Sequence, residues 1–326
     1  GRGGHRALSA VRALLAIGCL VLLRAAAGSA PAGADPADAC VTATKTNRYA
    51  DGQTVGRLDD PRLAEISGIA ASRRHDGLYW IHNDSGDGPN LYAIDATGNL
   101  LGTVVVDDAV AFDWEDIAAF ERDGKPYLLI GDIGDNYGLR PRYELIAIEE
   151  PEPPADSATP RHVQSAWRVH FRYADGPRDG ETLAVDTGRD RVLLLSKRRD
   201  PPQLASVPLH PDGEATRLAT PLGALGFPGA DPCTGAAAPT RVRPTGFAIS
   251  PDGREAAVVG YREVWIYRRR DREDWVEALA RAPAERHSVG LLPQPEAVDF
   301  DRDGRAIVAT GEKRGSPILR FARPGH

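Results

Sequence analysis

Glutamate recurs at one position, at the start of several short apolar segments of the chain. The three glutamates are Glu115, Glu181 and Glu296, and Ser67 and Thr245 take the equivalent position in two further segments. If the segments are neighbouring strands, the carboxylates repel one another unless they are protonated, paired with cations or bound to a metal ion. Oxygen-only ligands favour calcium over zinc or copper. The pattern therefore predicts a calcium site.

Charged residues also end the second apolar segment of each pair. They are Asp84, Asp132, Lys197, Arg262 and Glu312. In an antiparallel hairpin the end of the second strand lies beside the start of the first, so we expect both sets at one acidic mouth. The expected metal ligands are Glu115, Glu181, Glu296, Asp84 and Asp132. Lys197 and Arg262 are expected to bind an anionic group of a ligand.

The same residues leave a structural alternative and no complete catalytic motif. The glutamates could instead form salt bridges and accept hydrogen bonds from strand-start amides. Ser85 follows Asp84, but the G-x-S-x-G turn of serine hydrolases does not surround it. His82 is a candidate proton carrier beside Asp84. The catalytic residue therefore stays unknown from these motifs.

The strands that would position these residues follow a recurrent pattern. The segment 111–136 reads as a β-hairpin with acidic groups at its open end. Similar first strands at 67–70, 115–118, 181–184, 245–248 and 296–299 recur at intervals of roughly 50 to 65 residues, as in a propeller. Each is followed by two or three further strands, and four antiparallel strands make one blade.

The pattern predicts an all-β fold, a β-propeller of five four-stranded blades, with six blades as the alternative. Residues 51–326 would form one domain. A strand near 54–58 would complete the last blade, closing the ring by pairing the N-terminal and C-terminal strands. A short surface helix is expected within 271–282.

Composition limits the classes of function. The chain has 326 residues, is 42% hydrophobic and carries a formal net charge of −6, and its 34 glycines and 26 prolines indicate many turns. Nucleic-acid surfaces need clustered Lys and Arg in excess, so the charge argues against a nucleic-acid partner. An acidic balance suits cations.

The N-terminal residues are typical of an exported bacterial protein. Residues 1–30 combine basic residues, an apolar run and small residues, as in a cleaved signal peptide. Residues 31–50 are expected to form a flexible leader. Cys40 and Cys233 would then form a disulfide. We expect a secreted or extracytoplasmic monomer with no membrane attachment after cleavage.

Two stretches carry a resemblance to a known family. They are S-G-I-A at 67–70 and P-E-A-V-D-F-D-R-D-G-R-A-I-V-A-T-G-E-K at 295–313, followed by P-I-L-R-F. Over 65–321 the chain resembles secreted bacterial β-propellers of the phytase-like (esterase-like) family. The resemblance implies a calcium-associated propeller that acts on or binds an anionic or ester substrate, and it points to Glu296 and Glu312 as candidate catalytic positions. Only three of the five equivalent first-strand positions are glutamate.

Two functions follow from these observations. The preferred interpretation is a ligand-binding module in which the acidic mouth binds calcium and an exposed rim binds a small anionic molecule, a glycan or a protein. The alternative is a metal-assisted phosphoester or ester hydrolase of the phytase-like type. Because one fold can host both, the fold alone does not decide between them.

Overall fold

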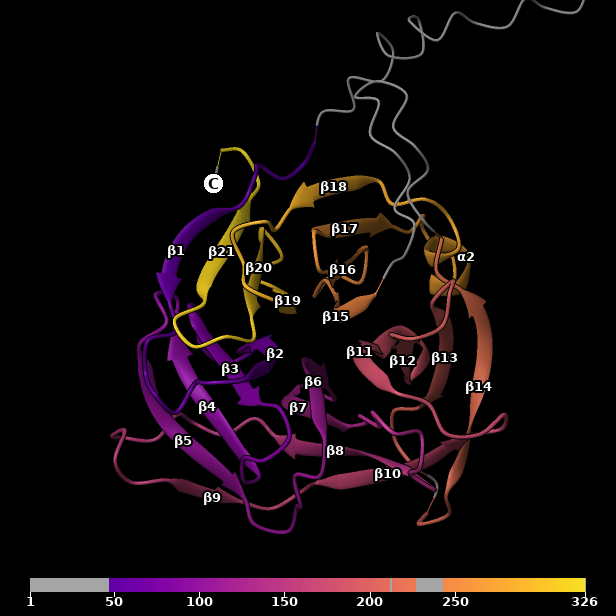
Figure 1. Cartoon of the computed structure of the whole chain (residues 1–326), viewed down its shortest axis with the longest axis horizontal. Coiled ribbons are helices and arrows are strands. Elements are labelled where there is room, and N and C mark those ends of the chain that lie inside the picture. The colour runs from indigo at the N-terminus through magenta and orange to yellow at the C-terminus, as the bar shows by residue number, and fades with distance from the viewer. Residues whose placement is uncertain (1–46, 212, 227–242, 326) are drawn as a thin grey trace, which may run out of the picture. The chain divides into compact units, whose positions relative to one another are not determined.

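A computed structural model describes residues 47–211, 213–226 and 243–325, and the regular secondary structure of this part of the chain is almost entirely β-strand (Figure 1). The expected signal peptide, most of the expected leader, and both Cys40 and Cys233 lie outside the described residues. The described strands form four sheets. None of the described helices has the length and apolar character needed to cross a membrane.

Each sheet has a defined spatial order of strands, in which neighbours are joined by hydrogen bonds. One sheet contains, in this order, β2 (Ile66–Ala71), β3 (Leu78–Asn83), β4 (Asn90–Asp95), β5 (Leu100–Val106) and β9 (Arg161–Val163). The largest contains β6 (Trp114–Arg122), β7 (Lys125–Asp132), β8 (Tyr143–Glu149), β10 (Trp167–Tyr173), β14 (Arg217–Ala224), β13 (Gln203–Pro208), β12 (Arg191–Ser196) and β11 (Gly180–Asp186). A third contains β15 (Pro244–Ile249), β16 (Glu255–Gly260), β17 (Glu263–Arg268) and β18 (Glu285–Ser288). The fourth contains β19 (Pro295–Phe300), β20 (Ala306–Gly311), β21 (Pro317–Ala322) and β1 (Gln53–Arg57).

The predicted hairpin of 111–136 is confirmed as β6 and β7. The two strands pair antiparallel, with Trp114 opposite Asp132 at the open end. The two turn residues, Asp123 and Gly124, have φ of 51° and 74°. Positive φ at both central residues is what a two-residue hairpin turn of type I′ requires. The start of the first strand therefore lies beside the end of the second, as the sequence indicated.

Five strands that each begin a run of antiparallel strands form the centre of the structure. These first strands are β2, β6, β11, β15 and β19, and each contacts the next in a closed circuit, because β19 also contacts β2 (Figure 1). Glycine allows the close approach: a Cβ on Gly68 would lie 2.9 Å from the Ile117 nitrogen, and one on Gly246 would lie 2.8 Å from the Glu296 carbonyl oxygen.

The strand expected near 54–58 is β1, and it pairs antiparallel with β21. Tyr49, four residues before β1, is only 2% exposed. The expectation that the flexible leader extends to residue 50 is therefore wrong for its last residues, which pack against the folded chain.

Two parallel pairings were not predicted. β5 pairs with β9, and β10 pairs with β14 through three residues on each strand. The second pairing joins two four-stranded groups into the eight-stranded sheet. Both lie at outer edges, where exposed backbone groups accept any neighbouring strand of suitable direction.

The described helical segments are short. A 3₁₀ turn, η1, spans Thr187–Arg189, and α2 spans Trp275–Leu279 within the segment expected to be helical. Asp274 caps α2 by accepting a hydrogen bond from the Val276 nitrogen at 2.9 Å. Trp275 and Leu279 are fully buried, so α2 packs into a core rather than lying freely on the surface.

Candidate metal centre

A polar cavity of about 140 Å³ lies where the first strands begin. We call it the acidic cavity. Its lining residues are Ser67, Asp84, Glu115, Asn136, Glu181, Lys197, Tyr261, Gln294, Glu296 and Glu312. Six of these belong to the sets that the sequence singled out: Asp84, Glu115, Glu181, Lys197, Glu296 and Glu312. The structure therefore brings together carboxylates that are far apart along the chain.

An irregularity at the start of each first strand explains how the glutamates reach the cavity. The pairing register shifts across Ser67, Glu115, Glu181, Thr245 and Glu296. A bulge residue of this kind has no opposite partner and turns its side chain away from the regular alternation. Four of the five bulge residues line the acidic cavity.

Two groups of carboxylates meet at Glu115. In one group, side-chain oxygens of Asp84, Asp113 and Glu115 lie within 4.8 Å of one another, and the same holds for Glu115, Asp179 and Glu181 in the other. A single cation can contact three oxygens at that spacing. Hard cations with six to eight oxygen ligands, calcium above all, suit such a set better than metals that prefer nitrogen or sulfur.

Asp113 and Asp179 are missing from the predicted ligand set. Each lies two residues before a bulge glutamate, in Asp113-Trp114-Glu115 and Asp179-Gly180-Glu181. The repeated D-x-E spacing is the signal that identifies them. Because the bulge residue comes two positions later, the aspartate and the glutamate of each D-x-E sequence direct their carboxylates into the same group.

Burial sets the protonation of the cluster. Burial raises the pKa of Glu115 well above its ordinary value, and the charges of Glu181, Asp84 and Asp113 raise it further. Burial also raises the pKa of Glu296 to about 8 and that of Glu181 to about 7, although Lys197 counteracts the rise in both. Glu296 therefore holds a proton at neutral pH unless a cation replaces it, and burial also disfavours the charged form of Glu115.

Two cations already neutralise part of the cluster. Lys197 Nζ lies 2.8 Å from Glu181 Oε2, and Arg198 Nε lies 2.7 Å from Asp179 Oδ2. Burial alone would lower the pKa of Lys197, but Glu181 and Glu296 outweigh it and hold the pKa above its ordinary value. The salt bridge to Glu181 is the structural alternative foreseen from the sequence, and it accounts for one of the three glutamates.

Gly134 brings the backbone against the carboxylates. A Cβ at this position would lie 2.3 Å from Glu115 Oε1 and 2.4 Å from Asp113 Oδ2. The Ile133 and Gly134 nitrogens both donate to the Asp113 carbonyl oxygen at 3.2 Å. The loop after β7 therefore closes over the Asp113 and Glu115 side chains only because residue 134 has no side chain.

Asp132 is not brought into either carboxylate group of the described residues. Its Oδ1 forms an ion pair with Arg140 Nη1 at 2.7 Å, and its carboxylate accepts hydrogen bonds from the Phe112 and Asp113 nitrogens. Asp132, predicted from the sequence to be a metal ligand, thus lies outside both groups, where it pairs with Arg140 and fixes the start of β6.

Two further candidates also lie away from the acidic cavity. His82 is fully buried, with Nδ1 2.9 Å from the Asn83 carbonyl oxygen and its ring edge-on to Trp114. Burial lowers the pKa of His82 to about 4. Arg262 is exposed and does not line the cavity, whereas its neighbour Tyr261 does. A proton carrier at His82 and an anion clamp at Arg262 are therefore not supported.

Glu296 and Glu312 both line the acidic cavity. Glu312 is already partly paired, since Lys313 Nζ lies 3.2 Å from its Oε1 and Gln294 Nε2 contacts its Oε2. Comparison of the chain with models of protein families and with curated proteins finds no match. The function of the chain must therefore be inferred from the geometry of the described residues.

Proposed function

We propose that the described strands form a five-bladed β-propeller, with the acidic cavity at one end of its axis. The closed circuit of contacts among the five first strands supports this proposal. So does the pairing of β1 with β21, which gives the last group its fourth strand. In this arrangement β10 and β14 are the outer strands of two adjacent blades that touch at their edges.

The function supported best is a ligand-binding module that holds a divalent cation, calcium, in the acidic cavity. The observation that carries the proposal is the position of Glu115, whose carboxylate belongs to both carboxylate groups. One cation there would contact oxygens of Glu115 and of Asp84, Asp113, Asp179 or Glu181. It would also replace the protons that burial favours on Glu115 and Asp113.

Exposed apolar side chains support a binding role for the same end of the molecule. Among the described residues, nine large apolar side chains are exposed. Six of them lie on segments that precede first strands or follow second strands: Val110, Phe112, Tyr137, Leu139, Tyr261 and Leu291. Exposed apolar groups gathered near a site commonly mark a binding surface.

Calorimetric titration of the chelator-treated full chain with calcium chloride tests the proposal. We expect saturable binding and a higher melting temperature, and Glu115→Gln should weaken binding at least tenfold, about 1.4 kcal/mol. The matched control is Glu277→Gln, an exposed position on α2, which should bind calcium as the unaltered chain does. Absence of saturable calcium binding would contradict the proposal.

A metal-assisted phosphoester or ester hydrolase, like the phytase-like proteins that the sequence resembles, is the second candidate. It is favoured by Lys197, which lies beside the carboxylates in the acidic cavity and offers a cation to an anionic substrate group. A bound calcium ion would supply Lewis-acid chemistry. Calcium-dependent turnover of chromogenic phosphate or acyl esters, abolished by Glu296→Gln without loss of thermal stability, would establish this candidate over the binding module.

A further inference from the structure

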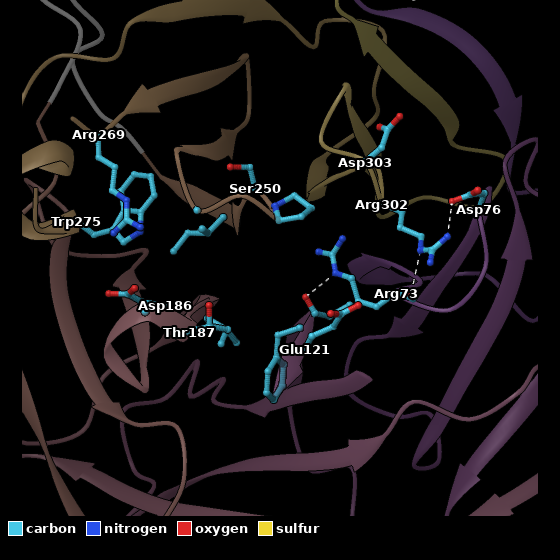
Figure 2. A pocket seen from close by; sticks show the side chains of 17 residues that line it. Arg73, Asp76, Glu121, Asp186, Thr187, Ser250, Arg269, Trp275, Arg302 and Asp303 are labelled. Carbon is cyan, nitrogen blue, oxygen red and sulfur yellow. Dashed lines mark hydrogen bonds and ion pairs between the residues drawn. The ribbon is translucent and has the colours of Figure 1, made fainter. Parts of the chain in front are cut away.

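A second, larger cavity lies at the opposite end of the first strands, where these strands finish. Its volume is about 530 Å³, within the range of small-molecule sites. Its walls come from residues at or just after the ends of the first strands, including Arg73, Glu121, Asp186, Ser250 and Arg302 (Figure 2). We call it the arginine cavity, after Arg73, Arg269 and Arg302. It shares no lining residue with the acidic cavity.

Most acidic groups of the arginine cavity already have cationic partners. Asp76 Oδ1 lies 2.9 Å from Arg302 Nη1, Asp186 Oδ2 lies 3.0 Å from Arg191 Nε, and Asp303 Oδ2 lies 3.7 Å from Arg305 Nε. Glu121 is the one lining acid that makes no ion pair with another described residue. The acidic side chains are therefore largely neutralised, although they outnumber the arginines.

Arg73, in contrast, has unused hydrogen-bonding capacity. The residue is 8% exposed, its Nε donates to the Ala119 carbonyl oxygen at 3.1 Å, and its Nη1 has no hydrogen-bond partner among the described residues. The nearest carboxylate is Asp299, 3.9 Å from Nη2, beyond hydrogen-bonding distance. Figure 2 shows the Arg73 guanidinium directed toward the middle of the cavity. A buried donor left unpaired destabilises the fold, so an acceptor at Nη1 would be favoured.

A second cationic group stands on another wall. The Arg269 guanidinium lies over the Trp275 ring, 5.0 Å from its centroid, and forms no ion pair with any other described residue. The indole Nε1 of Trp275 also lacks a partner within the described part of the chain. The lining therefore carries three side chains, Arg73, Arg269 and Trp275, whose donors are not all paired within the described part of the chain, and Arg73 is the one that is both buried and directed into the cavity.

Apolar side chains complete the walls between these donors. Val185, Ile249 and Pro251 all line the cavity, together with Phe120. Inorganic anions gain nothing from such walls, whereas an organic anion buries its hydrocarbon part against them.

From these contacts we infer that the arginine cavity binds a small organic carboxylate. The carboxylate accepts hydrogen bonds from Arg73, and the hydrocarbon part rests on Val185 and Ile249, with Arg269 and Trp275 at its far side. Arginine suits this role because its planar guanidinium presents several donors to a planar carboxylate. The site is independent of the cation proposed for the acidic cavity.

Calorimetric titration of the full chain with sodium benzoate tests the inference, because benzoate combines a carboxylate with a flat apolar body. We expect saturable binding that Arg73→Gln weakens at least tenfold and that Arg269→Ala also weakens. The matched control is Arg142→Gln, an exposed arginine that lines neither cavity, which should leave the affinity unchanged. Chelation of calcium should leave it unchanged as well, which separates this test from that of the acidic cavity.

Three outcomes would overturn the inference. The first is absence of saturable benzoate binding at millimolar concentration. The second is unchanged affinity in Arg269→Ala. This variant removes the side chain that lies over the Trp275 ring, so it tests the site even if Arg73→Gln fails to fold. The third is binding of inorganic phosphate as tightly as benzoate, because phosphate has no apolar part to place against Val185 and Ile249.

Discussion

Glu115 illustrates how one residue can connect separate parts of the chain. Its carboxylate lies near Asp84 from the first sheet and near Asp179 and Glu181 at the start of β11. The Ser67 hydroxyl donates to its carbonyl oxygen at 2.8 Å, and the Thr245 hydroxyl donates to the carbonyl oxygen of Pro295, the residue before Glu296, at 2.8 Å. Two of the bulge residues, Ser67 and Thr245, therefore bond the backbone of the neighbouring first strand as well as packing against it.

Gly134→Ala should weaken calcium binding at least tenfold, about 1.4 kcal/mol. The added Cβ would overlap Glu115 Oε1 and Asp113 Oδ2, so the loop after β7 or the two carboxylates must move. Calorimetry measures the effect. Gly188→Ala is the control, because the nearest atom its Cβ would meet is 3.5 Å away. Equal affinities in the two variants would show that the close approach of Gly134 does not position the cluster.

The sequence predicted part of this site for a clear reason. Glu115, Glu181 and Glu296 were found because they take equivalent positions in repeated strands. The equivalence of Asp132 to Asp84 is visible along the chain, whereas the pairing of Asp132 with Arg140 depends on how the loop after β7 folds back. The burial of His82 under Gly68 is likewise a contact between strands that spacing along the chain does not reveal.

At the scale of elements, the order of the antiparallel strands along the chain was predictable from the sequence. Apolar segments separated by turn residues indicate consecutive antiparallel strands, and the expected strands are present in that order. The outer-edge pairings of β9 with β5 and of β14 with β10 join segments from different repeats. Such pairings depend on the path of the connecting loops, which local patterns do not determine.

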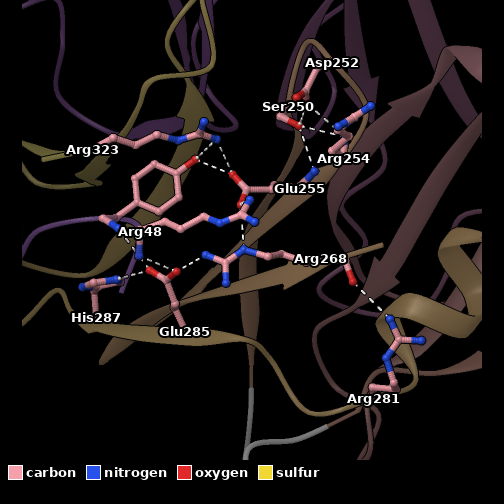
Figure 3. Close-up of polar contacts among 11 residues, drawn as sticks. Arg48, Ser250, Asp252, Arg254, Glu255, Arg268, Arg281, Glu285, His287 and Arg323 are labelled. Atoms are coloured by element: carbon pink, nitrogen blue, oxygen red, sulfur yellow. Dashed lines mark hydrogen bonds and ion pairs between the residues drawn. The ribbon is translucent and has the colours of Figure 1, made fainter. Parts of the chain in front are cut away.

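A buried ion-pair network joins the N-terminal segment to two sheets (Figure 3). Glu255, at the start of β16, accepts hydrogen bonds from the Tyr49 hydroxyl at 2.6 Å, Arg268 Nε at 2.7 Å and Arg323 Nη2 at 2.6 Å. Glu285 accepts hydrogen bonds from the backbone nitrogens of Arg48 and Tyr49. Burial would raise the pKa of Glu255, but hydrogen bonds from Tyr49 and Arg268 outweigh it and hold the pKa below its ordinary value.

Glu255→Gln should lower the free energy of unfolding by about 2 kcal/mol, because four side-chain hydrogen bonds, from Arg48, Tyr49, Arg268 and Arg323, lose their anionic acceptor. Urea unfolding of the full chain measures the change. Glu277→Gln, which alters an exposed side chain of α2, should change the free energy by no more than about 0.5 kcal/mol. If both substitutions had the same small effect, the network would contribute nothing measurable to stability.

At the scale of the whole molecule, the acidic cavity should make stability depend on pH and, with the proposed ion, on calcium as well. Burial raises the folded-state pKa of Glu296 to about 8, above its ordinary value of 4.5, so the folded chain holds a proton that the unfolded chain has lost. Without calcium, this contribution to stability is complete below pH 4.5 and is lost as the pH rises through about 8. A bound calcium ion should reverse the trend, because it binds the deprotonated carboxylates.

The melting temperature of the chelator-treated chain should therefore fall between about pH 5 and pH 8.5, and Glu296→Gln should make the fall shallower. At about pH 8.5, calcium at about one hundred times its dissociation constant should add about 2.7 kcal/mol of stability. Calorimetric melting with and without calcium measures both effects. A chelated chain that becomes more stable over this interval would contradict the raised pKa of Glu296.

The pairing of β1 with β21 also has a consequence for how the molecule is made. During synthesis β1 is made before every other described strand, and its partner β21 is made after all of them. In the nascent chain β1 therefore stays unpaired until β21 has been synthesised. Contacts so distant along the chain form slowly. Until they form, β1 and the edge that awaits it offer unsatisfied backbone groups to other nascent chains. Pairing of β1 with β21 then satisfies these backbone groups and removes that route to aggregation.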